Sequence, residues 1–290
     1  MTALKKLFVT GISLSIAFMA LPAVAAQHGA EASAKQIVVQ QAAGGDVRWI
    51  LPGPRRLDPA VFGTPGNPLG FEDDIGVPLK ARLLNDDGTA FTTTAGPTPM
   101  SDRHATITGS FRATLTDNTP VDSRASRDRA EGEFTFTDPK GVNEYRVVLI
   151  KILPMGPVHQ FFGGVLIDGF HHGKTSFGTR LQPTLYTYGA LWAVADLYVN
   201  GEKVSENRMV HMMTTERVRS SDADGYRLLI DGELSRTGIQ THLLLPNVVI
   251  TPEGPRPQPV PTGFVLPNGV EQPFIHIMFD STELEGLPVL

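Results

Sequence analysis

Cysteine is absent from this chain of 290 residues, and its absence excludes several kinds of site. Without thiols there is no disulfide bond, no thiolate metal ligand and no cysteine nucleophile. A lipid anchor of the bacterial lipoprotein type also requires a cysteine, so we expect no such membrane anchor. The fold must therefore be stabilised by a hydrophobic core, and the chain is long enough to bury one.

Long basic runs and catalytic signatures are absent as well. No cluster of Lys and Arg exceeds two adjacent residues, as at Arg55-Arg56, and acids outnumber bases by 30 to 25. Nucleic-acid-binding proteins gather Lys and Arg on one face, so we expect no nucleic-acid partner. Nucleophile elbows, Walker phosphate loops, dinucleotide-binding glycines and zinc-protease helices are also missing. The sequence therefore contains no catalytic motif.

The first 26 residues have the pattern of a cleavable secretory signal peptide. A lysine pair precedes an uncharged apolar run over residues 7–21, and a proline and four small residues follow it. The run of about 15 residues is shorter than the roughly 20 that a membrane-spanning helix needs. We expect cleavage after Ala25 or Ala26, which releases a soluble protein into a bacterial periplasm or beyond. Removal of two lysines and no acid would change the net charge from −5 to about −7.

Turn-forming residues are plentiful, and the segments between them predict strands. The chain has 29 Gly and 23 Pro, which favours many turns and few long helices. Alternating or β-branched sequence predicts strands over residues 79–84, 105–115, 131–137, 145–153, 158–167, 191–199, 202–214, 226–230, 241–245, 248–251 and 274–279. We expect two hairpins, one around residues 138–141 and one around Asn200-Gly201, a typical type I′ turn. Roughly ten short strands indicate an all-β antiparallel sandwich or barrel.

The N-terminal region is irregular and rich in Pro and Gly. Residues 27–45 are small and polar and are expected to form a flexible leader, and only residues 33–41 and 58–62 could be helical. The predicted organisation is a signal peptide at 1–26, a loop-rich region at 27–130 packed on the core, and a main β domain at 131–290. A Pro-rich stretch at 252–261 is expected to be a surface crossover.

Histidine and methionine alternate on two of the predicted strands. Met209, His211 and Met213 share one face of their strand, and His276 and Met278 share one face of theirs. Imidazole and thioether ligands suit Cu(I), so the sequence offers a copper site if the two strands are neighbours. The alternative is structural, because Met fills cores and a strand histidine commonly makes a structural hydrogen bond.

Other histidines offer weaker candidates. His171 and His172, next to Asp168, are expected on an exposed loop, where they would bind a metal or simply be solvated. His159 and His242 border apolar sequence. Either could line an interior cavity as a catalytic group, or be a core residue with a backbone partner.

An acidic residue and several aromatic residues gather on the first arm of the Asn-Gly hairpin. Asp196 interrupts an apolar run, and a buried charge needs a partner, for which Arg208 or Arg217 is expected. This is either an ion pair within the sheet or a general acid in a small-molecule pocket. The candidate ligand-binding aromatics are Tyr186, Tyr188, Trp192 and Tyr198.

Three functions remain open. The first is an exported, non-catalytic binding or scaffold protein of the bacterial cell envelope, with a small molecule or an envelope protein as partner. The second is a β-barrel enzyme or carrier acting on a small apolar molecule. The third is a periplasmic copper-binding protein that uses the His/Met strands.

Overall fold

A computed structural model describes residues 34–69, 77–95, 98–118, 126–153, 164–175 and 182–289. The predicted signal peptide and His159 lie outside these ranges. The described residues belong to one compact unit, Ser33–Leu290. They form one α-helix, α1 (Pro59–Phe62), and three short 3-10 helices, η1 (Leu79–Ala81), η2 (Gly173–Thr175) and η3 (Asp222–Asp224). Their strands are β1 (Lys35–Gln41), β2 (Val47–Ile50), β3 (Gly63–Thr64), β4 (Asn67–Pro68), β5 (Arg82–Leu84), β6 (Phe91–Thr94), β7 (His104–Ile107), β8 (Gly109–Asp117), β9 (Arg129–Thr137), β10 (Glu144–Ile152), β11 (Val165–His171), β12 (Leu185–Val199), β13 (Glu202–Arg217), β14 (Ser235–Leu245), β15 (Val248–Thr251), β16 (Gly254–Pro257), β17 (Ile275–Phe279) and β18 (Glu283–Glu285).

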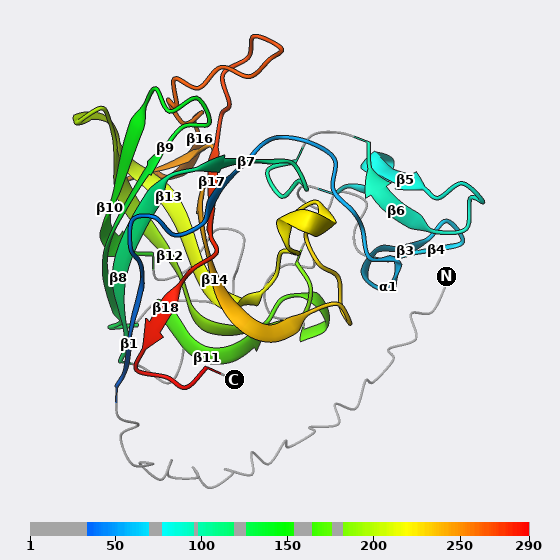
Figure 1. The fold of residues 1–290 in the computed structure, drawn as a ribbon, viewed down its shortest axis with the longest axis horizontal. Coiled ribbons are helices and arrows are strands. Elements are labelled where there is room, and N and C mark those ends of the chain that lie inside the picture. Colours follow the sequence, from blue (N-terminus) through cyan, green and yellow to red (C-terminus); the bar gives the residue numbers. More distant parts are fainter. Residues whose placement is uncertain are drawn as a thin grey trace, which may run out of the picture. The chain divides into compact units, whose positions relative to one another are not determined.

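Most of the strands belong to one antiparallel sheet of 14 strands. Its main path runs β18-β1-β8-β9-β10-β12-β13-β14-β17-β2-β7, while β11 pairs with β12, and β15 joins β13 to β16. The sheet curls into a half-barrel, and Figure 1 shows the long strands β12, β13 and β14 curving side by side. The predicted all-β class is therefore confirmed. Within the described segments, no helix has the length and apolar character needed to cross a membrane.

One face of the curled sheet carries the main hydrophobic core. Successive side chains on a strand point to opposite faces, so alternate residues of many of the sheet's strands enter this core. Val210 and Met212 of β13 enter it, as do Ile275 and Ile277 of β17. Trp49 of β2 is fully buried at its centre, among three other aromatic rings. The opposite face of β13, β14 and β17 is also buried, as described below.

Both expected hairpins are confirmed. β12 and β13 meet at Asn200-Gly201, whose φ angles of 51° and 85° are the positive values that a type I′ turn requires. β9 and β10 pair on either side of residues 138–141. The side chain of Asp138 closes that turn by accepting hydrogen bonds from the backbone N–H groups of Lys140 and Val142, at 2.8 and 3.0 Å.

The region before residue 50 corrects two expectations. The expectations of a flexible leader and of a helix over residues 33–41 are both wrong. β1 pairs there with β8 and β18 and buries Ile37 and Val39. Ile37 and Val39 alternate with polar residues, the period of a strand rather than of a helix.

The short helix expected over residues 58–62 is confirmed as α1. Asp58 caps it by accepting a hydrogen bond from the Ala60 N–H at 2.8 Å.

Several other expected strands also need correction. Residues 226–230 make only a single bridge, Arg219 to Leu228, and form no strand. Residues 79–84 begin as η1, so only β5 is strand there, and the strand expected at 105–115 divides into β7 and β8. The surface crossover at 252–261 contains β16, which folds back on β15. The beginning of the strand expected at 158–167 lies outside the described residues.

Candidate functional site

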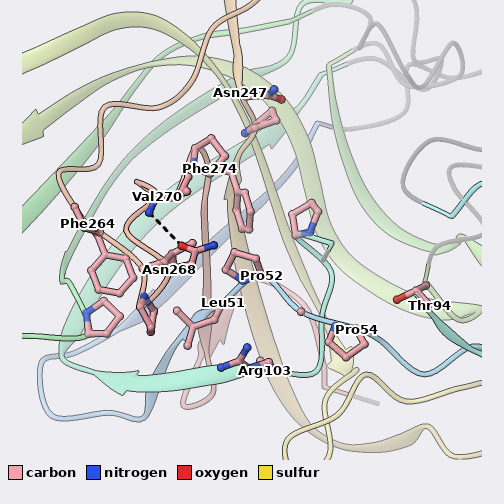
Figure 2. A pocket seen from close by; sticks show the side chains of 18 of the residues that line it. Leu51, Pro52, Pro54, Thr94, Arg103, Asn247, Phe264, Asn268, Val270 and Phe274 are labelled. Atoms are coloured by element: carbon pink, nitrogen blue, oxygen red, sulfur yellow. Dashed lines mark hydrogen bonds between the residues drawn. The ribbon is translucent and has the colours of Figure 1, made fainter. Parts of the chain in front are cut away.

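An open groove of about 1370 Å³ is the first candidate site. Figure 2 shows Leu51 and Pro52 between Phe264 and Val270 on one side and Pro54 and Thr94 on the other. Its lining residues are Leu51, Pro52, Gly53, Pro54, Leu83, Thr93, Thr94, Ala95, Pro99, Arg103, Pro139, Lys140, Leu244, Pro246, Asn247, Phe264, Val265, Leu266, Pro267, Asn268, Val270, Pro273 and Phe274. Three of its apolar side chains are exposed to solvent, namely Leu83, Val265 and Val270.

Backbone hydrogen bonds hold the two walls of this groove. On one wall, residues 51–57 run beside residues 92–95 and 98–103, with the Leu51 N–H donating to the Arg103 carbonyl and the Thr98 N–H to the Gly53 carbonyl, both at 2.9 Å. On the other wall, residues 264–272 fold back on themselves, with the Leu266 N–H donating to the Val270 carbonyl at 2.9 Å. The groove is therefore built from loops tied to a rigid sheet, a common arrangement for binding sites.

Proline dominates the chemistry of the walls. Seven of the lining residues are Pro, and none is Asp or Glu. Because proline has no N–H group, these walls offer few backbone donors to an extended peptide. An added β-strand depends on such backbone hydrogen bonds, so the lining suits an apolar body better than a peptide strand.

The groove contains two cations and no countercharge. Lys140 donates to the Val265 carbonyl at 3.3 Å, with its ammonium 5.6 Å from the centre of the Phe264 ring. The aliphatic stem of Arg103 lies against Gly53, where a Cβ atom would come within 2.6 Å of the arginine Cδ. Among the described residues, the Arg103 guanidinium has no hydrogen-bond or ion-pair partner, so it is available to an anion in the groove.

The second candidate is the buried face of β13, β14 and β17 that lies opposite the main core. We call it the His/Met face; its residues are Met209, His211, Met213, His242, Leu244, His276 and Met278. Cross-strand pairing puts Met213 opposite His242 and His242 opposite Met278. In the next row, His211 lies opposite Leu244, and Leu244 opposite His276. The row of Met213, His242 and Met278 therefore crosses three adjacent strands.

The three histidines of this face touch through their rings. The ring centre of His242 lies 5.2 Å from that of His211 and 5.4 Å from that of His276. The Nδ1 atom of His211 is 2.8 Å from the Leu191 carbonyl, and Nδ1 of His276 is 2.8 Å from the Pro99 carbonyl. Trp192 stacks on His211, with ring centres 4.4 Å apart.

Burial keeps two of these imidazoles neutral. It lowers the pKa of His276 to about 3, with a smaller contribution from the nearby Arg219 guanidinium. The pKa of His242 also lies well below its ordinary value, first because of burial and then because His276, His172 and Arg219 are close. Both rings are therefore uncharged at neutral pH, the form that binds metals.

The expected copper site needs one correction. β13 and β17 are not neighbours, because β14 lies between them and contributes His242. His242 was expected only as a catalytic or core residue, yet it is the group through which His211 and His276 are connected. Within the described residues, no three His, Cys, Asp or Glu side chains are grouped to hold a metal ion.

His171 and His172 are not on an exposed loop. Both are buried, at 0 % and 1 % exposure; His171 ends β11, where it pairs with Leu185 of β12, and His172 follows directly. Nε2 of His172 lies 3.1 Å from Sδ of Met213, which brings this histidine to the His/Met face. Asp168 instead pairs with Lys35 at 3.0 Å and accepts a hydrogen bond from the hydroxyl of Tyr186.

The candidates on β12 are dispersed. Asp196 pairs with Lys203 at 2.6 Å, so the expected partners Arg208 and Arg217 are wrong. The hairpin bulges opposite Asp196, which shifts the register that parity alone would give. Tyr186 and Tyr188 touch each other, whereas Tyr198 lies under the Arg146 guanidinium at 4.0 Å. None of the four aromatics lines the groove, so their role in ligand binding stays a prediction.

The groove and the His/Met face share a boundary. Leu244 belongs to both, and Pro99, which lines the groove, accepts the hydrogen bond from His276. The sequence did not indicate the groove residues Arg103, Phe264 and Val270. Their segments were recognisable as irregular, but no local signal shows that they converge.

No family model matches the chain, and comparison with curated proteins and with solved structures finds no match to either.

Proposed function

We propose that the protein is an exported, non-catalytic binding protein of the bacterial cell envelope that holds an anionic amphiphile in its groove. The observation that carries this proposal is an apolar, proline-rich groove whose only charged side chains are two cations. The chain as a whole is acidic, with a net charge of −5, so a cationic groove is a local exception that favours an anion.

The volume and lining suggest the class of ligand. Pockets for drug-sized ligands measure about 300–1,000 Å³, whereas this groove is larger and open. A long acyl chain would lie along Leu51, Phe264 and Phe274, and its carboxylate or phosphate head would be bound by Arg103. The apolar contacts would supply affinity, and the charge-assisted hydrogen bond would supply orientation.

The test is calorimetric titration of the chain with a C16 carboxylate and with the matching neutral C16 alcohol. We expect saturable binding of both, with the carboxylate tighter. Arg103→Gln should weaken carboxylate binding by at least about tenfold, because it removes a hydrogen bond between charged groups worth about 1.5–3 kcal/mol. The alcohol should bind the variant as it binds the wild type.

The matched control is Arg129→Gln, since Arg129 is an exposed arginine on β9 that does not line the groove. It should leave both affinities unchanged. Equal losses in the two arginine variants would show that the effect is one of net charge, and failure of either ligand to bind the wild type would refute the proposal.

A further inference from the structure

We propose that Met213, His242 and Met278 form a buried site for one soft monovalent metal ion, Cu(I) or Ag(I), a role separate from the groove. The three residues lie directly opposite one another on β13, β14 and β17. Side chains so paired have Cβ atoms roughly 5 Å apart, and methionine has three rotatable bonds with which to bring its sulfur toward the central ring. The row therefore places one thioether on each side of the His242 imidazole.

The imidazole of His242 is ready to act as a ligand. It is 4 % exposed, and within the described part of the chain its buried Nε2 atom has no hydrogen-bond partner. A buried nitrogen of this kind normally has one, because leaving it unpaired costs free energy. The neighbouring His276 has the same feature, with Nδ1 on the Pro99 carbonyl and Nε2 without a partner.

A nitrogen of the His172 imidazole lies close to the sulfur of Met213. Nε2 of His172 is 3.1 Å from Sδ of Met213, so an imidazole and a thioether are close enough to share one small ion. Met213 and Met278 also belong to one apolar cluster with Ile50 and Val218. The thioethers are thus enclosed in a dry environment, where a soft, weakly hydrated ion is favoured over a strongly hydrated one.

The charges around the row select the kind of ion. Thioethers and neutral imidazoles carry no negative charge, and no carboxylate or thiolate joins them in a metal-holding group of described residues. The Arg219 guanidinium is buried close to His242 and His276 and would repel a cation. The carboxylate of Asp280, the residue that follows β17, accepts hydrogen bonds from Tyr226 and Gln240. One positive charge is tolerated better than two, so Zn(II) and other divalent ions are disfavoured.

The experiment uses the full chain and Ag(I), which is stable in air and has the ligand preferences of Cu(I). We expect one tightly bound ion per chain by equilibrium dialysis. The melting temperature should rise by about 5 °C at saturation, because the ion binds the native state only. Zn(II) at the same concentration should give no rise.

The decisive variants exchange methionine for leucine, a change that conserves volume. Met213→Leu/Met278→Leu should melt close to the wild type without metal but bind Ag(I) at least about tenfold more weakly. Met212→Leu is the matched control, since Met212 is equally buried on the same strand but points into the main core. It should bind Ag(I) like the wild type.

Three results would overturn the proposal. The first is that the wild type does not bind one Ag(I) ion per chain. The second is that the double variant binds Ag(I) as tightly as the wild type. The third is that Zn(II) raises the melting temperature by a similar amount and that the double variant abolishes this rise. Loss of binding in Met212→Leu as well would also count against it, because the effect would then come from core packing.

Discussion

Replacing Trp49 with alanine is expected to lower the free energy of unfolding by about 3–5 kcal/mol, the cost of removing a large aromatic side chain from a core. Trp49 is fully buried, and its ring centre lies 5.9 Å from that of Phe136, 5.4 Å from that of Tyr145 and 5.6 Å from that of Phe264. The substitution would leave a cavity that these rings cannot fill. Because Phe264 also lines the groove, we expect ligand affinity to fall in the same variant.

Urea unfolding followed by far-ultraviolet circular dichroism measures this effect. Trp49→Phe should recover much of the lost stability, and Val142→Ala should change it by less than about 0.5 kcal/mol, since Val142 is 71 % exposed. A loss below about 1 kcal/mol in Trp49→Ala would mean that β2 is not part of the cooperative core.

Acid is expected to destabilise the protein through its buried histidines. In the unfolded chain a histidine takes up a proton near pH 6.5, whereas burial in the native state lowers the pKa of His276 to about 3. The unfolded state therefore binds more protons between these values, so stability is complete above about pH 6.5 and is lost progressively as the pH falls toward about 3. The pKa of His242 is lowered in the same direction, and each such histidine contributes a slope of about 1.4 kcal/mol per pH unit.

His276→Asn isolates this contribution. The Asn amide can keep the hydrogen bond to the Pro99 carbonyl, but it cannot be protonated in this range. Urea unfolding at several pH values between 6.5 and 4 should give a pH dependence shallower than that of the wild type by about one proton. Because the carboxylates titrate in both proteins, their effect cancels in the comparison. Parallel pH dependences would show that His276 is solvated or charged in the native state.

Local sequence rules predicted the parts of the fold that local physics decides. The Asn200-Gly201 hairpin is an example, since two positive φ angles select those residues whatever surrounds them. Strand parity likewise showed that Met209, His211 and Met213 share a face. β1 was missed because its polar neighbours resemble a leader, and only pairing with β8 and β18 reveals it as a strand.

Features that depend on contacts between distant segments could not be predicted from the sequence. β14 enters between β13 and β17, so the central role of His242 depends on strand order, which no local pattern encodes. The burial of His171 and His172 was not predicted, because no local pattern shows that the end of β11 pairs with β12. The groove joins segments near residues 52, 103 and 264, each of which taken alone is an ordinary loop.

The central claim is that the groove binds a ligand. The most direct test is photo-crosslinking with a C16 carboxylate that carries a photoreactive group near the end of its chain. After irradiation and proteolysis, mass spectrometry should place the label on residues 51–54 or 264–274, which line the groove. An excess of unlabelled carboxylate should suppress the labelling. Labelling confined to residues that do not line the groove, or labelling that the competitor does not suppress, would contradict the account.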